Sequence, residues 1–188
     1  MTQTAPVAET TTTWNLDPTH TTVGFSAKHM MITTVRGTFS DVKGTIVIDG
    51  ASPDRSTVEA EIGVASISTG VEQRDGHLRS PDFLDADGFP AITFRSRRIE
   101  GALAVPGDRF KVVGDLTIHG TTREVTLDAS YEGKGQDPWG GERVSFSAST
   151  RIDRRDFGLT WNQVLEAGGV LVSNEIKLEI EAQAVKAA

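Results

Sequence analysis

The chain has 188 residues, which is enough for one all-β domain, and its formal net charge is −7 at pH 7. Its lysines and arginines are scattered, so it lacks the basic cluster with which proteins bind nucleic acid or adsorb to acidic membranes. It contains no cysteine, which excludes disulfides, thiolate metal sites and cysteine nucleophiles.

Residues 1–13 are rich in threonine and alanine and show no apolar periodicity. We therefore predict a mobile N-terminal tail, followed by one domain over residues 14–188. The tail lacks the basic and apolar regions of a secretory signal, and no apolar run is as long as a membrane span. We expect a cytoplasmic protein without stable insertion in a membrane.

From Trp14 onward, apolar and polar residues alternate, which is typical of β-strands with one buried face. The clearest apolar positions are Val23, Phe25 and Ala27; Val58, Ala60, Ile62 and Val64; Phe110 and Val112; Leu116 and Ile118; Val125, Leu127 and Ala129; Val144, Phe146 and Ala148; and Ile176, Leu178 and Ile180. Glycine, proline and aspartate cluster between these runs at residues 49–54, 105–108 and 133–138. The pattern predicts an all-β antiparallel fold of about eight strands, which hides its apolar face against a second sheet or by closing into a barrel.

One region carries signals of helix formation. Thr69 and Glu72 have the spacing of a capping box, and the pair Ser80-Pro81 is typical of a second helix start. We predict two short helical turns within residues 69–87. Both are short, and the first contains a glycine, so packing against a barrel mouth would have to stabilise them.

Several short motifs follow one another in a fixed order along the chain. They are Asp17-Pro18-Thr19-His20 with Lys28-His29-Met30; Val35-Arg36-Gly37-Thr38-Phe39; Arg74-Asp75-Gly76-His77-Leu78-Arg79; Phe89-Pro90-Ala91-Ile92; Gly114-Asp115-Leu116-Thr117-Ile118-His119; and Arg154-Arg155-Asp156-Phe157-Gly158. In this order and spacing they resemble the YceI-like family. The resemblance implies a lipocalin-like barrel with a short helical segment near its mouth, whose interior binds a polyisoprenoid, an isoprenoid quinone or a fatty-acid derivative. Many relatives look periplasmic, and a homodimer is compatible with the family.

If the interior holds a ligand, the inward apolar residues line it. We predict this lining to consist of Val23, Phe25, Ala27, Ile62, Phe94, Phe110, Val112, Leu116, Ile118, Phe146, Ala148 and Leu178. The candidates for contact with a polar head are His29, Arg74, His77, Arg79 and His119. The same alternation also produces an ordinary packed core, so the pattern does not distinguish an open barrel from a filled one.

The four histidines, His20, His29, His77 and His119, lack the short spacing that places metal ligands on one face of a helix or strand. We expect no metal and no other cofactor, and we predict no catalytic residue, because no serine stands in a nucleophile motif. The leading hypothesis is carriage or sequestration of one long-chain amphiphile. The alternatives are an enzyme acting on such a lipid through His29, His77 or His119, and a structural module with a filled barrel.

Overall fold

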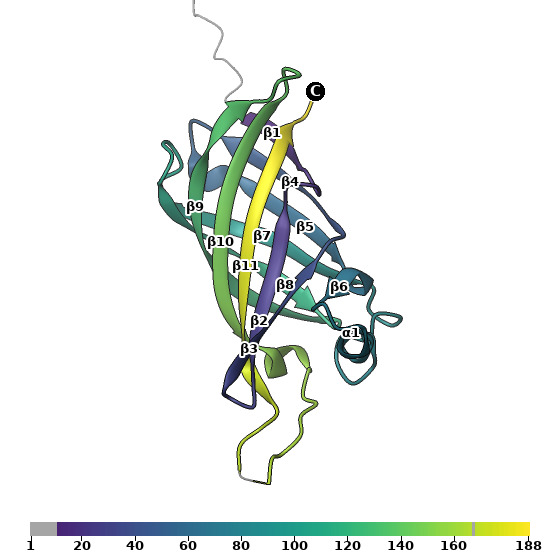
Figure 1. The fold of residues 1–188 in the computed structure, drawn as a ribbon. Helices are drawn as coiled ribbons and strands as arrows, with labels where there is room; N and C mark the ends of the chain where they lie inside the picture. Colours follow the sequence, from purple (N-terminus) through teal and green to yellow (C-terminus); the bar gives the residue numbers. More distant parts are fainter. Residues whose placement is uncertain (1–10, 167) are drawn as a thin grey trace, which may run out of the picture.

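The computed structural model describes residues 11–166 and 168–188, and it consists almost entirely of β-strands (Figure 1). The strands are β1 (Thr11–Leu16), β2 (Thr22–His29), β3 (Thr33–Phe39), β4 (Val42–Asp49), β5 (Thr57–Gly63), β6 (Ile67–Ser68), β7 (Ala91–Gly101), β8 (Arg109–Ile118), β9 (Thr121–Gln136), β10 (Glu142–Asp153) and β11 (Val172–Lys186). The helical elements are α1 (Glu72–Arg79) and the 3₁₀ turns η1 (Pro53–Arg55), η2 (Val64–Ser66) and η3 (Arg154–Phe157). No helix in these residues is long and apolar enough to cross a membrane.

All strands belong to one antiparallel sheet, in the order β1-β4-β5-β7-β8-β9-β10-β11-β2-β3-β6, with a further pairing of β1 with β11. The segments β1 and β2 are halves of one bent strand, because both pair with β11. Similarly, β3 continues into β4 and β5 into β6, because β4 pairs with β5 while β3 pairs with β6. The segments therefore form eight continuous strands, and pairing of the first with the last closes the sheet. The predicted eight-stranded antiparallel barrel is confirmed.

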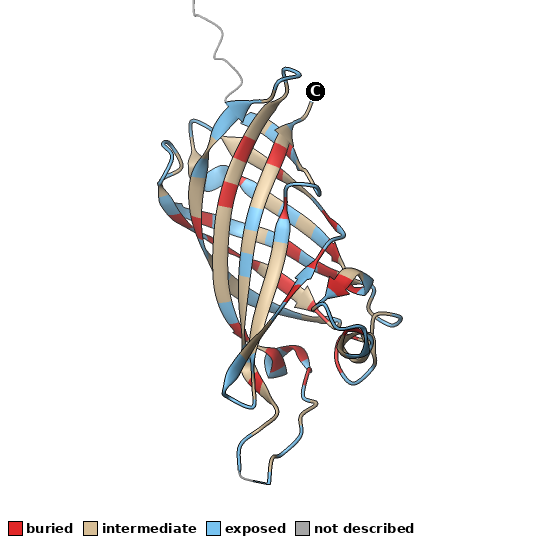
Figure 2. Ribbon diagram, viewed as in Figure 1, coloured by how far each residue is buried: buried red, intermediate tan, exposed pale blue. Residues whose placement is uncertain are grey.

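Strand β8 shows how the alternation builds the core. Phe110, Val112 and Leu116 are buried, whereas Lys111 between them is exposed and its Nζ lies 2.7 Å from Asp128 Oδ1 on β9. Figure 2 shows that more buried and more exposed positions alternate along several strands. With the exception of Val113 on β8, the buried apolar side chains of the strands form one cluster, so a single core fills most of the barrel.

The ordered domain begins earlier than predicted. Thr11, Thr12 and Thr13, which we assigned to the tail, pair with β4 and belong to β1, next to Trp14 with its almost fully buried side chain. Residues 1–10 lie outside the described residues. Threonine has a high propensity for strands, but a run of threonines shows no apolar alternation, which explains the error.

The segment between β6 and β7 contains one helix instead of two helical turns. The predicted capping box is absent, because the N-cap residue of α1 is Val71 and no side chain caps the helix. The Thr69 hydroxyl instead donates to Asp75 Oδ1. The helix ends at Ser80, which has an extended backbone because a proline follows it, and the next residues form hydrogen-bonded turns, as from Phe83 N to Ser80 O at 3.0 Å.

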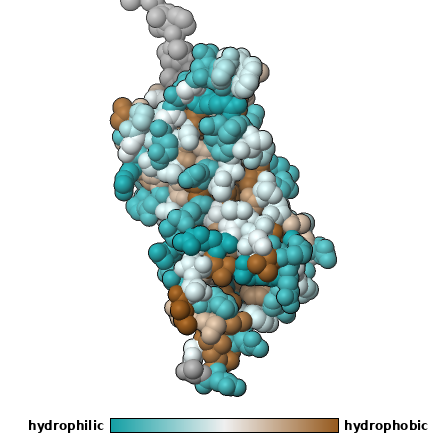
Figure 3. All heavy atoms as spheres, in the orientation of Figure 1, coloured by the Kyte–Doolittle hydropathy of each residue, from teal (hydrophilic) through white to brown (hydrophobic). Residues whose placement is uncertain are grey.

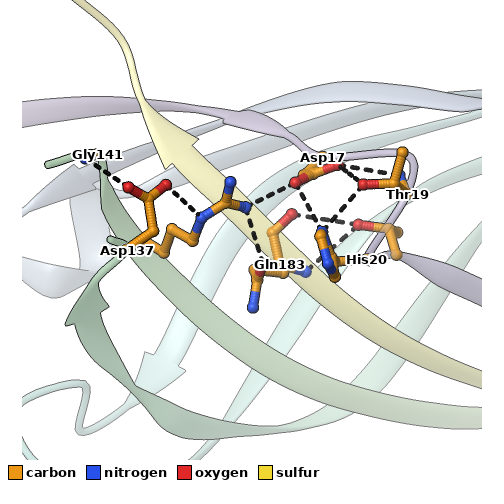
Figure 4. A network of polar contacts seen from close by, with 8 residues as sticks. Asp17, Thr19, His20, Asp137, Gly141 and Gln183 are labelled. Carbon is orange, nitrogen blue, oxygen red and sulfur yellow. Dashed lines mark hydrogen bonds and ion pairs between the residues drawn. The ribbon is translucent and has the colours of Figure 1, made fainter. Parts of the chain in front are cut away.

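A polar network closes the break between β1 and β2 (Figure 4). Arg143 of β10 reaches across β11, where its Nη1 lies 2.6 Å from Asp17 Oδ2 and donates to Gln183 Oε1 at 2.9 Å. Arg143 Nε lies 2.9 Å from Asp137 Oδ2, and His20 Nδ1 lies 2.9 Å from the Asp17 carboxylate. The network therefore connects β10, β11 and the bend in the first strand.

We expect acid to weaken this network. Hydrogen bonds from the Thr19 hydroxyl and from Arg143 hold the pKa of Asp17 well below its usual range. Because the folded-state pKa is lowered, ionised Asp17 stabilises the fold above the unfolded pKa of about 3.9, and this stabilisation disappears as the pH falls through the folded-state pKa. Asp17→Asn should cost about 1–3 kcal/mol at neutral pH and clearly less near pH 2, measured by urea unfolding. Asp54→Asn, in an exposed turn, is the control; a cost for Asp17→Asn that is equal at both pH values would contradict the role of its charge.

Candidate ligand-binding site

The interior of the barrel contains a cavity of about 180 Å³. Its lining is apolar except for Thr21, Ser56 and Ser147. The structure places ten of the twelve predicted lining residues around it: Val23, Ile62, Phe94, Phe110, Val112, Leu116, Ile118, Phe146, Ala148 and Leu178. Alternation thus identified one common enclosed surface contributed by strands from the whole sequence.

The cavity is narrow for a long ligand. Sites for drug-sized ligands usually measure about 300–1,000 Å³, and at about 30 Å³ per water-sized group this cavity holds roughly six heavy atoms. Aromatic side chains take up much of the interior: the Phe110 and Phe146 rings meet edge to face with centroids 6.1 Å apart, and Tyr131 lies 5.5 Å from Phe146. A chain of several isoprene units therefore needs additional space.

That space adjoins the cavity at the α1 end of the barrel, where a groove of about 690 Å³ opens. The groove is bounded by the β2–β3 hairpin, by α1 and by the segment that follows η3. Its apolar surface includes Val35, Leu78 and Trp161. The two remaining predicted lining residues, Phe25 and Ala27, lie here and not on the internal cavity. They face inward as predicted, but beyond the end of the enclosed space.

Two aromatic rings separate the groove from the cavity. Phe25 lines the groove, Phe39 lines the cavity, and their ring centroids lie 5.6 Å apart. Gly37 makes this arrangement possible, because a Cβ at that position would come within 2.6 Å of Phe25 Cε1 and 2.9 Å of the Ser68 carbonyl. The linings of the two spaces are therefore in direct contact through this ring pair.

The polar lining of the groove is basic or neutral. Lys28, His29, Arg74 and His77 contribute to it, and no carboxylate does so among the described residues. The structure therefore brings together three of the five predicted headgroup residues, although the net charge of the chain is −7. Such a surface favours a head that accepts hydrogen bonds or carries negative charge.

The groups in the groove differ in their freedom to bind. His77 Nε2 lies 2.9 Å from Asp82 Oδ2, and its ring packs edge-on against Trp161 with a centroid distance of 4.7 Å. Arg74 Nε donates to the Thr69 hydroxyl at 2.7 Å. Within the described part of the chain, the side chains of Lys28 and His29 have no hydrogen-bond or ion-pair partner. Lys28 and His29 are thus the groups most available to a ligand head.

Comparison with known proteins places the chain in a family. The family model for the YceI-like domain matches residues 14–184. The chain belongs to the YceI-like family. A UPF0312 protein of Pseudomonas putida is 35% identical over 167 residues, which cover 89% of this chain and 82% of the relative. The YceI protein of Campylobacter jejuni has a solved structure that is 31% identical, with a TM-score of 0.72, covering 86% of this chain and 90% of that one.

A more distant structure shares the fold. It is a domain from Saccharophagus degradans, described as polyisoprenoid-binding, which is 15% identical with a TM-score of 0.68 and covers 93% of this chain and 98% of that one. At this identity the likeness shows the barrel alone, which agrees with the closed sheet described above.

Two predicted headgroup residues of this YceI-like chain lie outside the groove. Arg79 points away from it, with Nη2 2.7 Å from Glu72 Oε1. His119 lies in the β8–β9 turn, where its ring packs on Phe89 at a centroid distance of 4.4 Å. Arg79 is near the groove residues in sequence and His119 stands in one of the family motifs, but the direction of each side chain depends on local turn geometry. Among the described residues, no cluster of three or more histidine and acidic side chains could hold a metal ion.

Arg154 is a residue whose importance the sequence interpretation missed. It is only 3% exposed and donates to the carbonyls of Ser173 at 3.0 Å, Leu159 at 2.5 Å and Trp161 at 2.9 Å. Burial lowers the pKa of its guanidinium below the usual value. Arg154 thereby fixes the segment that carries Trp161 across the mouth of this YceI-like barrel.

We expect Arg154→Met to destabilise the fold by about 2–4 kcal/mol, because it leaves buried carbonyls without donors. Arg155→Met is the matched control: the Arg155 side chain is 56% exposed and pairs with Asp153, so its loss should cost less than about 1 kcal/mol. Denaturant unfolding of both variants measures the difference. Equal costs would show that Arg154 does not anchor the mouth segment.

Proposed function

We propose that this chain binds one long-chain amphiphile, with the tail in the barrel and the polar head in the groove, and that it acts by reversible binding. The observation that carries the proposal is the placement of an apolar cavity behind a single aromatic ring pair, directly beside a groove with free basic side chains. The polyisoprenoid-binding description of the Saccharophagus degradans domain, which has the same fold, supports the same class of ligand.

The cost of the cavity to stability favours a ligand-binding space over a defect in packing. An apolar cavity lowers stability by about 24 cal/mol for each Å³, so a cavity of about 180 Å³ forgoes roughly 4 kcal/mol. Folded domains have a total stability of only about 5–15 kcal/mol. A sequence that needed only a filled barrel would recover most of that loss with a few larger side chains.

The tail has to extend beyond the closed cavity. Each buried methylene contributes about 0.8 kcal/mol, so roughly six carbons give about 5 kcal/mol before the cost of association. Micromolar binding requires about 8 kcal/mol net. We infer that a tight ligand passes the Phe25–Phe39 wall and occupies both spaces, so that chain length determines affinity more than the head does.

A filled structural barrel is the second candidate, because the small volume of the cavity favours it. The enzyme hypothesis gains no such support. His119 lies outside the groove, the ring of His77 is held by Asp82, Phe83 and Trp161, and His29, which lies in the groove, has no partner among the described residues that would orient it as a general base. Saturable binding of a lipid separates the two remaining candidates.

Partly filling the cavity should weaken tail binding. Ala129→Leu adds three carbons on the inner face of β9, and loss of contact with about two methylenes of the tail should weaken binding about tenfold. Thr126→Leu places the same side chain on the exposed face of the same strand and should bind like the wild type. Titration with a fluorescent isoprenoid measures both, beside urea melts. Absence of saturable wild-type binding would favour the filled barrel, and unchanged affinity in Ala129→Leu would place the tail elsewhere.

Removing the ring of Phe25 should open the path between groove and cavity. We expect Phe25→Ala to raise both the association and the dissociation rate severalfold, with a much smaller change in Kd, because a gate affects the barrier more than the end states. Stopped-flow mixing with the same fluorescent isoprenoid measures the rates. Phe89→Ala, whose ring packs on His119 outside both spaces, is the control. Unchanged rates in Phe25→Ala would mean that the ligand enters by another route.

A further inference from the structure

The mouth end of the barrel carries a cluster of exposed apolar side chains. Met30 is 41% exposed, Met31 60%, Ile32 75% and Val164 82%. We call these four residues the apolar tip. The other large apolar residues that are exposed in the described part of the chain are Val71, Val105 and Trp139. Figure 3 shows apolar surface gathered at this end of the molecule, while most of the barrel wall is hydrophilic.

The apolar tip is one continuous structure. Met30 N donates to Leu171 O at 2.8 Å, and Leu171 N donates to Gln163 O at 2.9 Å, so the β2–β3 turn lies beside the segment that carries Val164. In Figure 1 both segments project beyond the strands at the end opposite the β9–β10 turn. Leu171 also lines the groove, so the apolar tip borders the proposed entrance for the ligand.

The backbone of the β2–β3 turn is poorly suited to the residues that occupy it. Ile32 N donates to His29 O at 3.1 Å, and the two central residues, Met30 and Met31, have φ values of 52° and 61°. This is a type I′ turn, which strongly favours asparagine and glycine because both central residues are left-handed. Two large apolar side chains at strained, exposed positions do not stabilise the hairpin, so their presence requires another explanation.

The charge near the apolar tip differs from that of the whole chain. The hairpin from Thr22 to Phe39 contains Lys28, His29 and Arg36 but no aspartate or glutamate, although the chain as a whole carries −7. The segment that carries Val164 adds one exposed acid, Glu166, so the tip as a whole keeps a small excess of basic residues. Lys28 and Arg36 are exposed. At the opposite end, around exposed Trp139, acidic and basic residues pair: Asp137 with Arg143, and Glu142 with Lys134 and Lys186. Two basic residues are too few to hold an acidic chain on a membrane by charge alone, in agreement with the scattered lysines and arginines of the sequence. They favour a lipid surface with negative charge once the apolar residues insert.

We propose that the apolar tip docks reversibly on the surface of a lipid bilayer that contains anionic lipid. Met30, Met31, Ile32 and Val164 enter the boundary between headgroups and acyl chains, while Lys28 and Arg36 remain at the headgroups. The groove then opens toward the bilayer, where an amphiphile can pass between membrane and barrel. Docking itself is independent of ligand binding, and only its use for lipid exchange rests on the proposed function.

The test is flotation of the full chain with vesicles of phosphatidylcholine alone and with vesicles in which one third of the lipid is phosphatidylglycerol. The triple variant Met30→Asn, Met31→Gly, Ile32→Thr gives the turn its preferred residues and removes the apolar side chains, so it should fold at least as well as the wild type. We expect wild-type binding to be stronger on the anionic vesicles and weaker in high salt, and the variant to bind about tenfold less or worse. Trp139→Ser, which removes an exposed aromatic ring at the other end, should bind like the wild type.

Two results would overturn the proposal. One is a wild type that floats with neither kind of vesicle, which would leave the apolar tip as a surface for a protein. The other is undiminished vesicle binding by the triple variant. Titration of the variant with a soluble short-chain isoprenoid, without vesicles, keeps the two proposals apart: unchanged affinity there with lost flotation supports docking, and the proposed function fails only if the wild type does not bind the isoprenoid.

Discussion

The pairing of β11 with both of its neighbours is the constraint on which the rest of the structure depends. On one side β11 pairs with β10 from Glu175 to Val185, and on the other it pairs first with β2 and then with β1. An open antiparallel sheet of this length would leave its apolar face to be covered by something else. Closure gives all eight strands one shared interior, so the apolar residues of distant segments face the same space.

The interior of the barrel is partly filled by side chains and partly empty. Phe94, Phe110 and Phe146 fill much of it, while small residues such as Ala129 and Ala148 leave room between the strands. The empty volume costs stability, and closure, the Asp17–Arg143 network and the buried Arg154 stabilise the two ends around it. The groove, the Phe25–Phe39 wall and the apolar tip all occur at one end of the barrel, so the two ends differ in structure.

Period-two alternation predicted the face of each strand well, because neighbouring side chains of a strand must point to opposite sides. It did not give the position along the barrel axis, so Phe25 and Ala27 were expected in the same space as Val23, although they lie in the groove. The same alternation runs from Val144 to Ile152 and on to Arg154. The alternation therefore predicts that Arg154 faces inward. A charged residue is rarely buried, so it did not stand out as part of the core.

The parts that sequence reasoning missed depend on contacts between distant segments. The spacing of Thr69 and Glu72 fits a capping box. In the structure the Thr69 hydroxyl instead donates its hydrogen bond to the buried Asp75 carboxylate, so it does not cap the helix. Trp161 lies in a segment without periodicity, which is held at the mouth by the bond from Arg154 to the Trp161 carbonyl and by hydrogen bonds between Asn162 and Val172. The direction of Arg79 is set by Glu72, and His119 has a left-handed backbone in a tight turn. No local pattern encodes such choices.

The location of the tail tests the central claim most directly. Isotope-filtered NMR of the protein with a bound isoprenoid detects contacts between the ligand chain and individual methyl groups. The account predicts contacts of the tail with Val112, Leu116 and Ile118 inside the barrel and of the head region with Val35 and Leu78 in the groove. Contacts confined to the groove, with none to the three interior residues, would contradict it.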